Sequence, residues 1–547
     1  MARSARSTRF ELDARAADVL FSGLFARRQR RSDQGRGIPM LKQLRSHVCG
    51  QWRAGTGAGQ TLFNPATEEA LATVSSAGID VAAALDYARR RGGPALRAMT
   101  FAERGALLQA IAEAMQESRT ELLELGMANG GNTRSDAKFD VDGAIGTLHA
   151  YAEVAAGLGA RRMLVDGDGI QLGRSPRFHG QHVLVPRRGV AVHVNAFNFP
   201  AWNFAEKAAV ALLAGMPVVS KPATSSAMLA HRVVELVVEQ KLLPDGALSF
   251  LAGSPGELLA QVGAQDVVAF TGSGETAARI RSLPNVVRHS VRVNVEADSL
   301  NAAVLGSDVQ PVSGMFETFL RDVERDMTQK AGQKCTAIRR VLVPRSSMDE
   351  VKAALAELLA AVPVGDPALA STRMGPVATA AQRDEVRAGV GALLGEGTKV
   401  FEQPSLPAKG YFVGPTLIEA RDGAGAVHER EVFGPVAVLI AYDEAPQEIV
   451  SRGNGGLVCS IYSDDLSFIE GVVADVAPHH GRIFLGHPKI ELSPGPGTVL
   501  PQLVHGGPGR AGGGEELGGA RGLAFYSQRV ALEGSRPVIQ KLLGGEG

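Results

Sequence analysis

The stretch Gln329-Lys-Ala-Gly-Gln-Lys-Cys-Thr-Ala337 places one cysteine after a glycine-containing turn and close to two lysines. A thiol is a nucleophile only as the thiolate, a form that nearby positive charge or backbone N–H groups favour. The chain holds three cysteines in 547 residues, namely Cys49, Cys335 and Cys459. A lone cysteine is more often a small buried residue than a nucleophile, but the surroundings of Cys335 favour the nucleophile.

A glutamate upstream of Cys335 is the candidate base. Glu296 ends the alternating apolar run Val291-Arg-Val-Asn-Val-Glu296, which is typical of a strand. A carboxylate at the end of a strand can accept a proton from a thiol or from a water. On its own, Glu296 also fits a surface ion pair, so its assignment as the base depends on the motifs around it.

Six motifs together resemble the aldehyde dehydrogenase family. In chain order they are Asn195-Ala-Phe-Asn-Phe-Pro200, Ser220-Lys-Pro-Ala-Thr224, Phe270-Thr-Gly-Ser-Gly-Glu275, Glu296, Gly332-Gln-Lys-Cys-Thr-Ala337 and Glu431-Val-Phe-Gly-Pro435. Each motif alone is weak evidence, whereas the set in this order and spacing is a specific signal. The resemblance runs from about Leu41 to the C-terminus. It implies an α/β protein with the aldehyde dehydrogenase fold.

The resemblance also implies a division of the chain. We expect a Rossmann-like cofactor domain, a catalytic α/β domain and a bridging β element for oligomerisation. Strands that alternate with helices between residues 190 and 295 independently predict a mostly parallel sheet, whose ligands bind at the carboxyl ends of the strands. The expected parts are residues 1–39 as a disordered or dispensable extension, 40–159 and 189–297 as the cofactor-binding domain, 298–519 as the catalytic domain, and 160–188 with 520–547 as the oligomerisation element.

Composition narrows the possible partners and compartments. The formal net charge is zero, so nothing favours nucleic acid or an anionic membrane as a partner. Three cysteines without a pairing pattern indicate a reducing compartment, and we expect a cytoplasmic protein. No spacing of histidines and cysteines resembles a zinc site, so we expect no metal. Residues 1–39 hold nine arginines but also several acids, which argues against a transit peptide.

The resemblance implies a covalent route from aldehyde to acid. Cys335 would attack the carbonyl carbon, and the side chain of Asn198 with the Cys335 backbone N–H would stabilise the oxyanion. Glu296 would activate the water that hydrolyses the resulting thioester. On its own, Asn198 also fits a structural role, in which its side-chain amide caps a turn. The sequence departs from the family at Ala297-Asp-Ser299, where most members have leucine and two glycines, and this leaves the mobility of Glu296 open.

The residues around Lys221 predict the cofactor. Family members that prefer NAD often place a glutamate where this chain has Thr224, to hold both hydroxyls of the adenine ribose. A carboxylate there would repel a 2′-phosphate, whereas threonine leaves room for it and Lys221 adds a cation. We therefore expect NADP as the preferred cofactor, with NAD as a weaker alternative. Thr224 also fits a cap of the helix that follows it.

Further cofactor contacts follow from the other motifs. The turn at 270–275 resembles the family's entry into a helix whose first N–H groups face the cofactor pyrophosphate. Glu431 and Phe433 match the residues that hold the nicotinamide ribose and pack near the ring. The residues expected to contact the cofactor are Phe197, Lys221, Thr224, Gly253, Gly272, Ser273, Glu431 and Phe433.

The substrate is predicted by resemblance alone. The run Glu296-Ala-Asp-Ser-Leu-Asn301 is similar to a branch of the family that acts on CoA-linked semialdehydes in the aerobic breakdown of aromatic acids. One kind of member is a stand-alone dehydrogenase of benzoate breakdown. Another is the dehydrogenase half of a fused ring-opening enzyme of phenylacetate breakdown, which carries a second, hydratase-like domain. Because the chain ends at Gly547 without room for that domain, we expect the stand-alone kind.

Three other functions stay open. The chain could be a general aldehyde dehydrogenase that acts on free aldehydes. It could be an acylating enzyme in which CoA releases the thioester, although such enzymes need no base and Glu296 argues against this. It could also be a non-catalytic protein that has kept the fold.

In the family, a C-terminal strand crosses to a partner subunit, and residues 523–532 resemble it, so we expect at least a homodimer.

Overall fold

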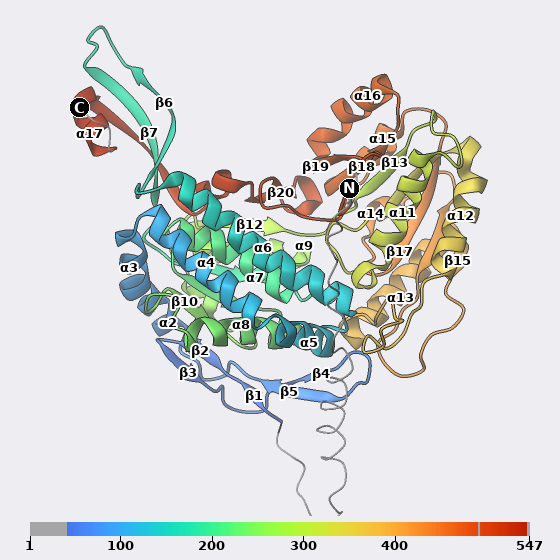
Figure 1. Ribbon diagram of the computed structural model, residues 1–547, viewed down its shortest axis with the longest axis horizontal. Coiled ribbons are helices and arrows are strands. Elements are labelled where there is room, and N and C mark those ends of the chain that lie inside the picture. Colours follow the sequence, from blue (N-terminus) through green and yellow to red (C-terminus); the bar gives the residue numbers. More distant parts are fainter. Residues whose placement is uncertain (1–40, 491–492, 544–547) are drawn as a thin grey trace, which may run out of the picture. The chain divides into compact units, whose positions relative to one another are not determined.

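The computed structural model describes residues 41–490 and 493–543. The expectation for residues 1–39 lies outside these ranges. Two seven-stranded sheets, each flanked by helices, form the centre of the described chain (Figure 1). Among the described residues, none of the helices has the length and apolar character needed to cross a bilayer.

The first sheet has the strand order β12-β11-β8-β9-β10-β2-β3. Its strands from β12 to β10 are parallel, and β2 and β3 are antiparallel additions at one edge. The bounds are β2 Ser46–Val48, β3 Gln51–Arg53, β8 Ala191–Val194, β9 Val218–Lys221, β10 Leu248–Phe250, β11 Val267–Thr271 and β12 Arg292–Glu296. The strands from β8 to β12 are rich in valine and mostly buried, as expected for a parallel sheet that is covered on both faces.

Helices cover this first sheet in two layers. Helix α7 packs against β8 and β9 on one side and against α4 and α6 on the other, so all of its residues are buried. Thr100 and Glu103 form a capping box that fixes the start of α4. The helices of this half are α2 Val81–Tyr87, α3 Gly93–Ala98, α4 Phe101–Glu117, α5 Arg119–Gly130, α6 Arg134–Leu158, α7 Pro200–Leu213, α8 Ala227–Glu239, α9 Gly274–Arg281 and α10 Pro284–Arg288.

The second sheet has the order β15-β16-β17-β14-β13-β18-β19 and is parallel except for β15. Its strands are β13 Ala302–Leu305, β14 Arg340–Pro344, β15 Gly397–Glu402, β16 Thr416–Ala420, β17 Val436–Tyr442, β18 Gly456–Tyr462 and β19 His480–Leu485. Its helices are α11 Gly314–Thr328, α12 Met348–Ala360, α13 Ala380–Gly395, α14 Ala426–Glu429, α15 Pro446–Ser451 and α16 Leu466–Val476. Cys459 is buried in β18, as its apolar neighbours predict.

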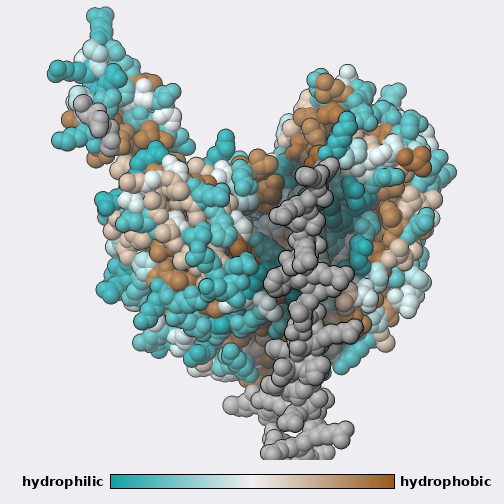
Figure 2. Space-filling view, viewed as in Figure 1, coloured by the Kyte–Doolittle hydropathy of each residue, from teal (hydrophilic) through white to brown (hydrophobic). Residues whose placement is uncertain are grey.

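A three-stranded antiparallel sheet extends away from α4 and α6 (Figure 1). It consists of β6 Leu164–Gln171, β7 Phe178–Pro186 and β22 Ser527–Ser535, and α17 Arg536–Leu542 follows it. Strand β22 pairs with β7 of the same chain along its whole length, so the two segments assigned to the oligomerisation element meet within one chain. Contact of this sheet with a partner subunit stays a prediction. Figure 2 shows hydrophobic residues beside hydrophilic ones on this sheet, and Ile170, Phe178 and Val530 are exposed there.

Two smaller sheets complete the described chain. One is formed by β1 Gln43–Leu44, β4 Gln60–Phe63 and β5 Ala70–Val74, and the other by β20 Val504–Gly507 and β21 Gly514–Leu517. The glycine- and proline-rich sequence of residues 493–519 reads as a linker, yet it contains β20 and β21. Between β10 and β11 the chain forms only a short 3₁₀ turn, Leu258–Gln261.

Candidate active site

The predicted residues meet in a cavity of about 660 Å³ at the carboxyl ends of β8, β9, β11 and β12. The predicted residues that line it are Phe197, Asn198, Lys221, Thr224, Gly272, Ser273, Glu296, Cys335, Glu431 and Phe433. Gly253 is the exception, because it lines a neighbouring cavity of about 670 Å³. Thr224 borders both cavities, so the two adjoin at this residue.

The turn before Cys335 has an unusual backbone. Lys330, Ala331 and Gly332 follow one another with φ angles of 54°, 51° and 68°, all in the left-handed region. Only glycine adopts this conformation without steric cost. A Cβ on Gly332 would also lie 2.1 Å from the carbonyl oxygen of Gly434, so no larger residue fits there. The turn therefore brings the chain from the end of α11 back toward the first sheet and presents Cys335 to the cavity.

Two buried side chains hold this turn in place. Arg339 donates hydrogen bonds to the carbonyl oxygens of Gly332 at 2.9 Å, Lys334 at 3.1 Å and Gly434 at 2.8 Å. Asn301 donates to the carbonyl oxygen of Cys335 at 2.8 Å. Both residues are fixed by tertiary contacts, and the sequence alone gave no sign of these roles.

The two lysines near Cys335 do not face its sulfur. Lys330 Nζ donates to Asn132 Oδ1 at 3.0 Å, and Lys334 Nζ pairs with Asp326 Oδ1 at 2.6 Å. The expectation that these cations favour the thiolate is therefore wrong. Burial, and then the negative charge of Glu296, raise the pKa of the Cys335 thiol well above its usual value. The resting cysteine is a neutral thiol that needs a base.

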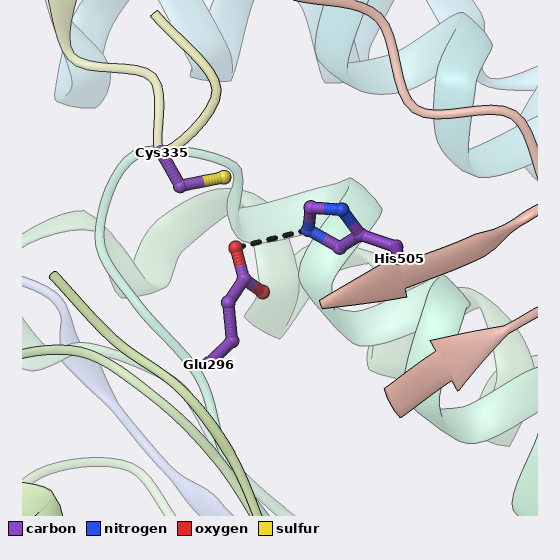
Figure 3. Close-up of side chains that lie close together, drawn as sticks. All are labelled: Glu296, Cys335 and His505. Atoms are coloured by element: carbon purple, nitrogen blue, oxygen red, sulfur yellow. Dashed lines mark ion pairs between the residues drawn. The ribbon is translucent and has the colours of Figure 1, made fainter. Parts of the chain in front are cut away.

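Glu296 lies beside Cys335 and is the candidate for that base (Figure 3). Its carboxylate is buried at the end of β12 and accepts a hydrogen bond from Thr271 Oγ1 at 3.3 Å. Burial acts to raise the pKa of Glu296, but the charge of His505, with smaller contributions from Lys207 and Cys335, lowers that pKa to about 2. Glu296 is thus ionised at neutral pH.

His505 is a site residue that the sequence reading missed. It lies on β20, and its Nε2 is 3.0 Å from Glu296 Oε1. Burial acts to lower the pKa of His505, but the negative charge of Glu296 outweighs it and raises that pKa. Because β20 lies in sequence that reads as a linker, no strand periodicity pointed to this residue.

A buried ionic cluster lies behind Glu296. Lys207 on α7 pairs with its neighbour Glu206 at 2.8 Å and with Glu516 on β21 at 3.2 Å. Oxygens of Glu206, Glu296 and Glu516 all lie within 4.8 Å of one another. The cluster therefore concentrates negative charge around the carboxylate that faces Cys335, and one ammonium group offsets only part of it.

Asn198 is positioned to present an amide N–H to the cavity. Its Nδ2 donates one hydrogen bond to the carbonyl oxygen of Gln333 at 3.0 Å. An amide nitrogen carries two N–H groups, so one remains for an oxyanion near the sulfur. The hydrogen bond ties Asn198 to the turn that carries Cys335 and fixes the direction of the second N–H.

Lys221 lines the cavity and is buried, and among the described residues no charged group offsets the effect of this burial on its pKa. Burial lowers the pKa of Lys221 to about 8. A buried cation of this kind is suited to a hydroxyl or phosphate of a bound nucleotide. Phe197 and Phe433 face each other edge to face with ring centroids 5.9 Å apart. Glu431 accepts a hydrogen bond from the Ser299 backbone N–H at 2.9 Å.

The turn that leads into α9 lines the cavity, and its predicted contact with a pyrophosphate stays a prediction. Ser273 caps the helix and accepts from the Thr276 N–H, and the Gly274 N–H donates to Asp298 Oδ1 at 3.1 Å. Two of the first N–H groups are therefore already paired. Asp298 is one of the residues at which the sequence departs from the family pattern. Lys221, Glu431 and Phe433 line the same cavity as this turn.

Comparisons with known proteins agree with this geometry. The sequence profile described as the aldehyde dehydrogenase family matches residues 52–531. The chain is 46% identical, over 85% of its length and 93% of the relative, to a 3,4-dehydroadipyl-CoA semialdehyde dehydrogenase of Aromatoleum evansii. It is 28% identical to lactaldehyde dehydrogenase of Escherichia coli, over 74% of the chain and 83% of the relative.

Solved structures have the same fold. An NAD+ complex of an aldehyde dehydrogenase from Bacillus cereus superimposes with a TM-score of 0.78 at 24% identity, covering 90% of this chain and 97% of the other. Lactaldehyde dehydrogenase of Escherichia coli gives a TM-score of 0.80 at 24% identity, covering 90% and 99%. These matches confirm the predicted fold. The chain belongs to the aldehyde dehydrogenase family.

Proposed function

We propose that this protein oxidises an aldehyde to a carboxylic acid through a covalent adduct on Cys335. The observation that carries the proposal is the Cys335 thiol beside the ionised Glu296 carboxylate, in a cavity that Asn198 also lines. A neutral thiol and an adjacent carboxylate are the pair that a base-activated sulfur nucleophile needs.

The first step follows from these positions. Glu296 accepts the proton of the Cys335 thiol, and the sulfur forms a bond to the carbonyl carbon of the aldehyde. The carbonyl oxygen becomes an oxyanion, which the free N–H of Asn198 and the Cys335 backbone N–H stabilise. Removing one such donor typically costs about 3 kcal/mol of transition-state stabilisation.

The second step releases the acid. A bound nicotinamide dinucleotide supplies the hydride acceptor, and Lys221, Glu431 and Phe433 would hold it. After hydride loss the substrate is a thioester of Cys335. Glu296 first releases the proton that it took from the thiol to solvent, and then takes a proton from a water that attacks the thioester carbon. The carbon–sulfur bond breaks, and the leaving Cys335 thiolate takes this proton from Glu296 to give the resting thiol. The balance is one aldehyde, one water and one oxidised dinucleotide giving one acid, one reduced dinucleotide and one proton.

We propose NADP as the preferred cofactor, with NAD as a weaker one. Thr224 borders the cavity and brings no negative charge to a 2′-phosphate. Lys221 lines the same cavity, and burial alone shifts its pKa, with no charged group of the described residues opposing it, so its ammonium group is available to that phosphate.

We propose a CoA-linked semialdehyde as substrate, namely dehydroadipyl-CoA semialdehyde in aromatic degradation. The support is the 46% identity to the Aromatoleum evansii protein of that name. A general dehydrogenase of free aldehydes, or the dehydrogenase of phenylacetate-type ring cleavage, is the alternative. The low number of cysteines supports a reducing compartment such as the cytoplasm.

We also propose that the chain is divided into a cofactor-binding domain, a catalytic domain and an oligomerisation element, and that it forms a homodimer. The first sheet lies within the residues assigned to the cofactor domain and the second within those assigned to the catalytic domain. The sheet of β6, β7 and β22 exposes apolar side chains that a second copy of the chain would cover.

The test is the formation of NADPH and NADH by the purified protein. It compares a CoA-linked semialdehyde with a free aldehyde of similar length. Fast turnover of the CoA-linked substrate with NADP supports the proposal. Equal turnover of the free aldehyde would favour the general dehydrogenase, and an absence of turnover with either would overturn the proposed oxidation.

A further inference from the structure

His505 lies against Glu296, which with Cys335 forms the proposed catalytic pair. The proposed mechanism gives this histidine no role. Its Nε2 lies 3.0 Å from Glu296 Oε1, and each side chain is about 4% exposed. Ligand atoms of His505, Glu296 and Cys335 all lie within 4.8 Å of one another, and the three residues come from three different segments (Figure 3). The contact has the distance of an ion pair but not the direction of a good hydrogen bond. Charge is therefore its main contribution.

The charges around His505 explain why a cation is needed there. The acidic groups that face it are Glu296 from β12, Glu206 from α7 and Glu516 from β21. Lys207 is the other cation of this group and already pairs with two of these carboxylates. Burying three carboxylates beside a single ammonium group would leave uncompensated negative charge, which favours protonation of at least one of them. A second cation next to Glu296 prevents its protonation.

We propose that His505 is a positioning residue which, as an imidazolium, keeps the base Glu296 ionised and aimed at the Cys335 sulfur. This inference rests on the proposed function, because it gives His505 its role through Glu296. His505 does not itself need to touch the aldehyde. It sets the protonation state of the group that accepts the proton of the thiol and later that of the water.

The sign of the expected pH effect follows from the charges. The pKa of His505 is raised, so its charge is present at low pH and is lost as the pH rises through that pKa. Without the imidazolium, burial and the neighbouring carboxylates raise the pKa of Glu296, and Lys207 opposes them only in part. Glu296 would then be protonated, and inactive as a base, over a wider range of acid pH. The acid side of the pH–rate profile should move toward neutral pH.

The test uses His505→Phe and His505→Gln in the full-length protein. Phenylalanine keeps a ring of similar size without charge, and glutamine keeps a hydrogen-bond donor without charge. His193→Phe is the matched control, because His193 is also buried and lies near Lys207, but burial lowers its pKa and it is uncharged. The pH dependence of kcat is measured with a free aldehyde. Alkylation of Cys335 by iodoacetamide is measured across pH by peptide mass spectrometry.

In both His505 variants we expect the acid limb of kcat to move up by about one pH unit, which is a tenfold loss at a fixed acid pH. KM should change by less than about twofold, because the aldehyde is bound by other groups. The rate of Cys335 alkylation at a fixed acid pH, where His505 is charged in the wild type, should also fall, since a cation near the thiolate is gone. His193→Phe should show neither change.

Two outcomes would overturn the inference. One is an acid limb of kcat and an alkylation rate at acid pH that stay unchanged in both variants. The other is an unchanged profile in His505→Gln alone, which would mean that a hydrogen bond suffices and charge is not the cause. If the wild-type protein oxidises no aldehyde, the proposed function fails. The alkylation rates at acid pH still decide whether His505 sets the charge at this site.

Discussion

At the scale of single residues, the site is defined by which charges face the sulfur. Cys335, Glu296 and Asn198 could be predicted because each lies in a short motif whose neighbours are adjacent in the chain. The directions of Lys330 and Lys334 could not, because the left-handed turn sends both side chains to partners that are distant in sequence. His505 was missed for a related reason, since its partner Glu296 is joined to it only by the tertiary structure.

Thr224→Glu should reverse the proposed preference for NADP over NAD. A carboxylate at this position would stand where the 2′-phosphate of NADP is proposed to lie, and like charges repel strongly at such distances. We expect KM for NADP to rise about tenfold or more, corresponding to about 1.4 kcal/mol, with KM for NAD equal or lower. Thr224→Ser, which adds no charge, is the control. An unchanged ratio of the two KM values in Thr224→Glu would remove Thr224 from the cofactor site.

At the scale of secondary structure, the elements with regular periodicity were predictable. Strand β11 and helix α8 lie in the region where strands were expected to alternate with helices. One is an apolar run, and the other shows helical spacing of apolar residues. Strands β20 and β21 were not predicted, because their glycines lack the side chains that mark a strand. Their pairing depends on neighbouring strands, and this is how His505 reaches the site.

The turn that carries Cys335 gives a prediction about stability and activity together. Gly332→Ala places a Cβ against the Gly434 carbonyl and forces alanine to a φ of 68°. We expect a loss of about 1–3 kcal/mol in the free energy of unfolding and a large fall in kcat, because the turn must shift. Both quantities follow from thermal melts and steady-state rates.

Gly157→Ala is the control for this change. Gly157 lies in α6 with open space around its Cβ position, so alanine should stabilise the protein by about 0.4–1 kcal/mol and leave kcat unchanged. If Gly332→Ala were as stable and active as the parent protein, the turn would not be the constraint that positions Cys335.

At the scale of the whole molecule, the described chain joins two parallel sheets, and their facing ends hold the two halves of the site. Cys335 comes from the segment between α11 and β14, whereas Glu296 and Asn198 follow strands of the first sheet. The resemblance predicted this fold, because the family motifs span nearly the whole chain. The pairing of β22 with β7 was not predicted, since sequence does not say which copy of a strand is the partner.

The exposed apolar residues on the sheet of β6, β7 and β22 predict that two copies of the chain associate through this sheet. Ile170→Lys combined with Phe178→Lys puts charge on two exposed apolar positions of this sheet and should convert a dimer into monomers in sedimentation velocity. Val287→Lys, at an exposed apolar position on α10, is the control and should leave the dimer intact. A double variant that still sediments as the parent protein would place the interface elsewhere.

The measurement that tests the central claim most directly is the intact mass of Glu296→Gln after mixing with an aldehyde and NADP. Glutamine accepts a proton neither from the Cys335 thiol nor from water. The mixture is therefore held at alkaline pH, where the thiol ionises without a base, and the thioester that forms should accumulate because it is not hydrolysed. We predict an added acyl mass on the peptide of Cys335, steady-state turnover at least about a hundredfold lower, and no added mass when Cys335→Ala is combined with it. Unchanged turnover without an acyl adduct would contradict the covalent mechanism with Glu296 as its base.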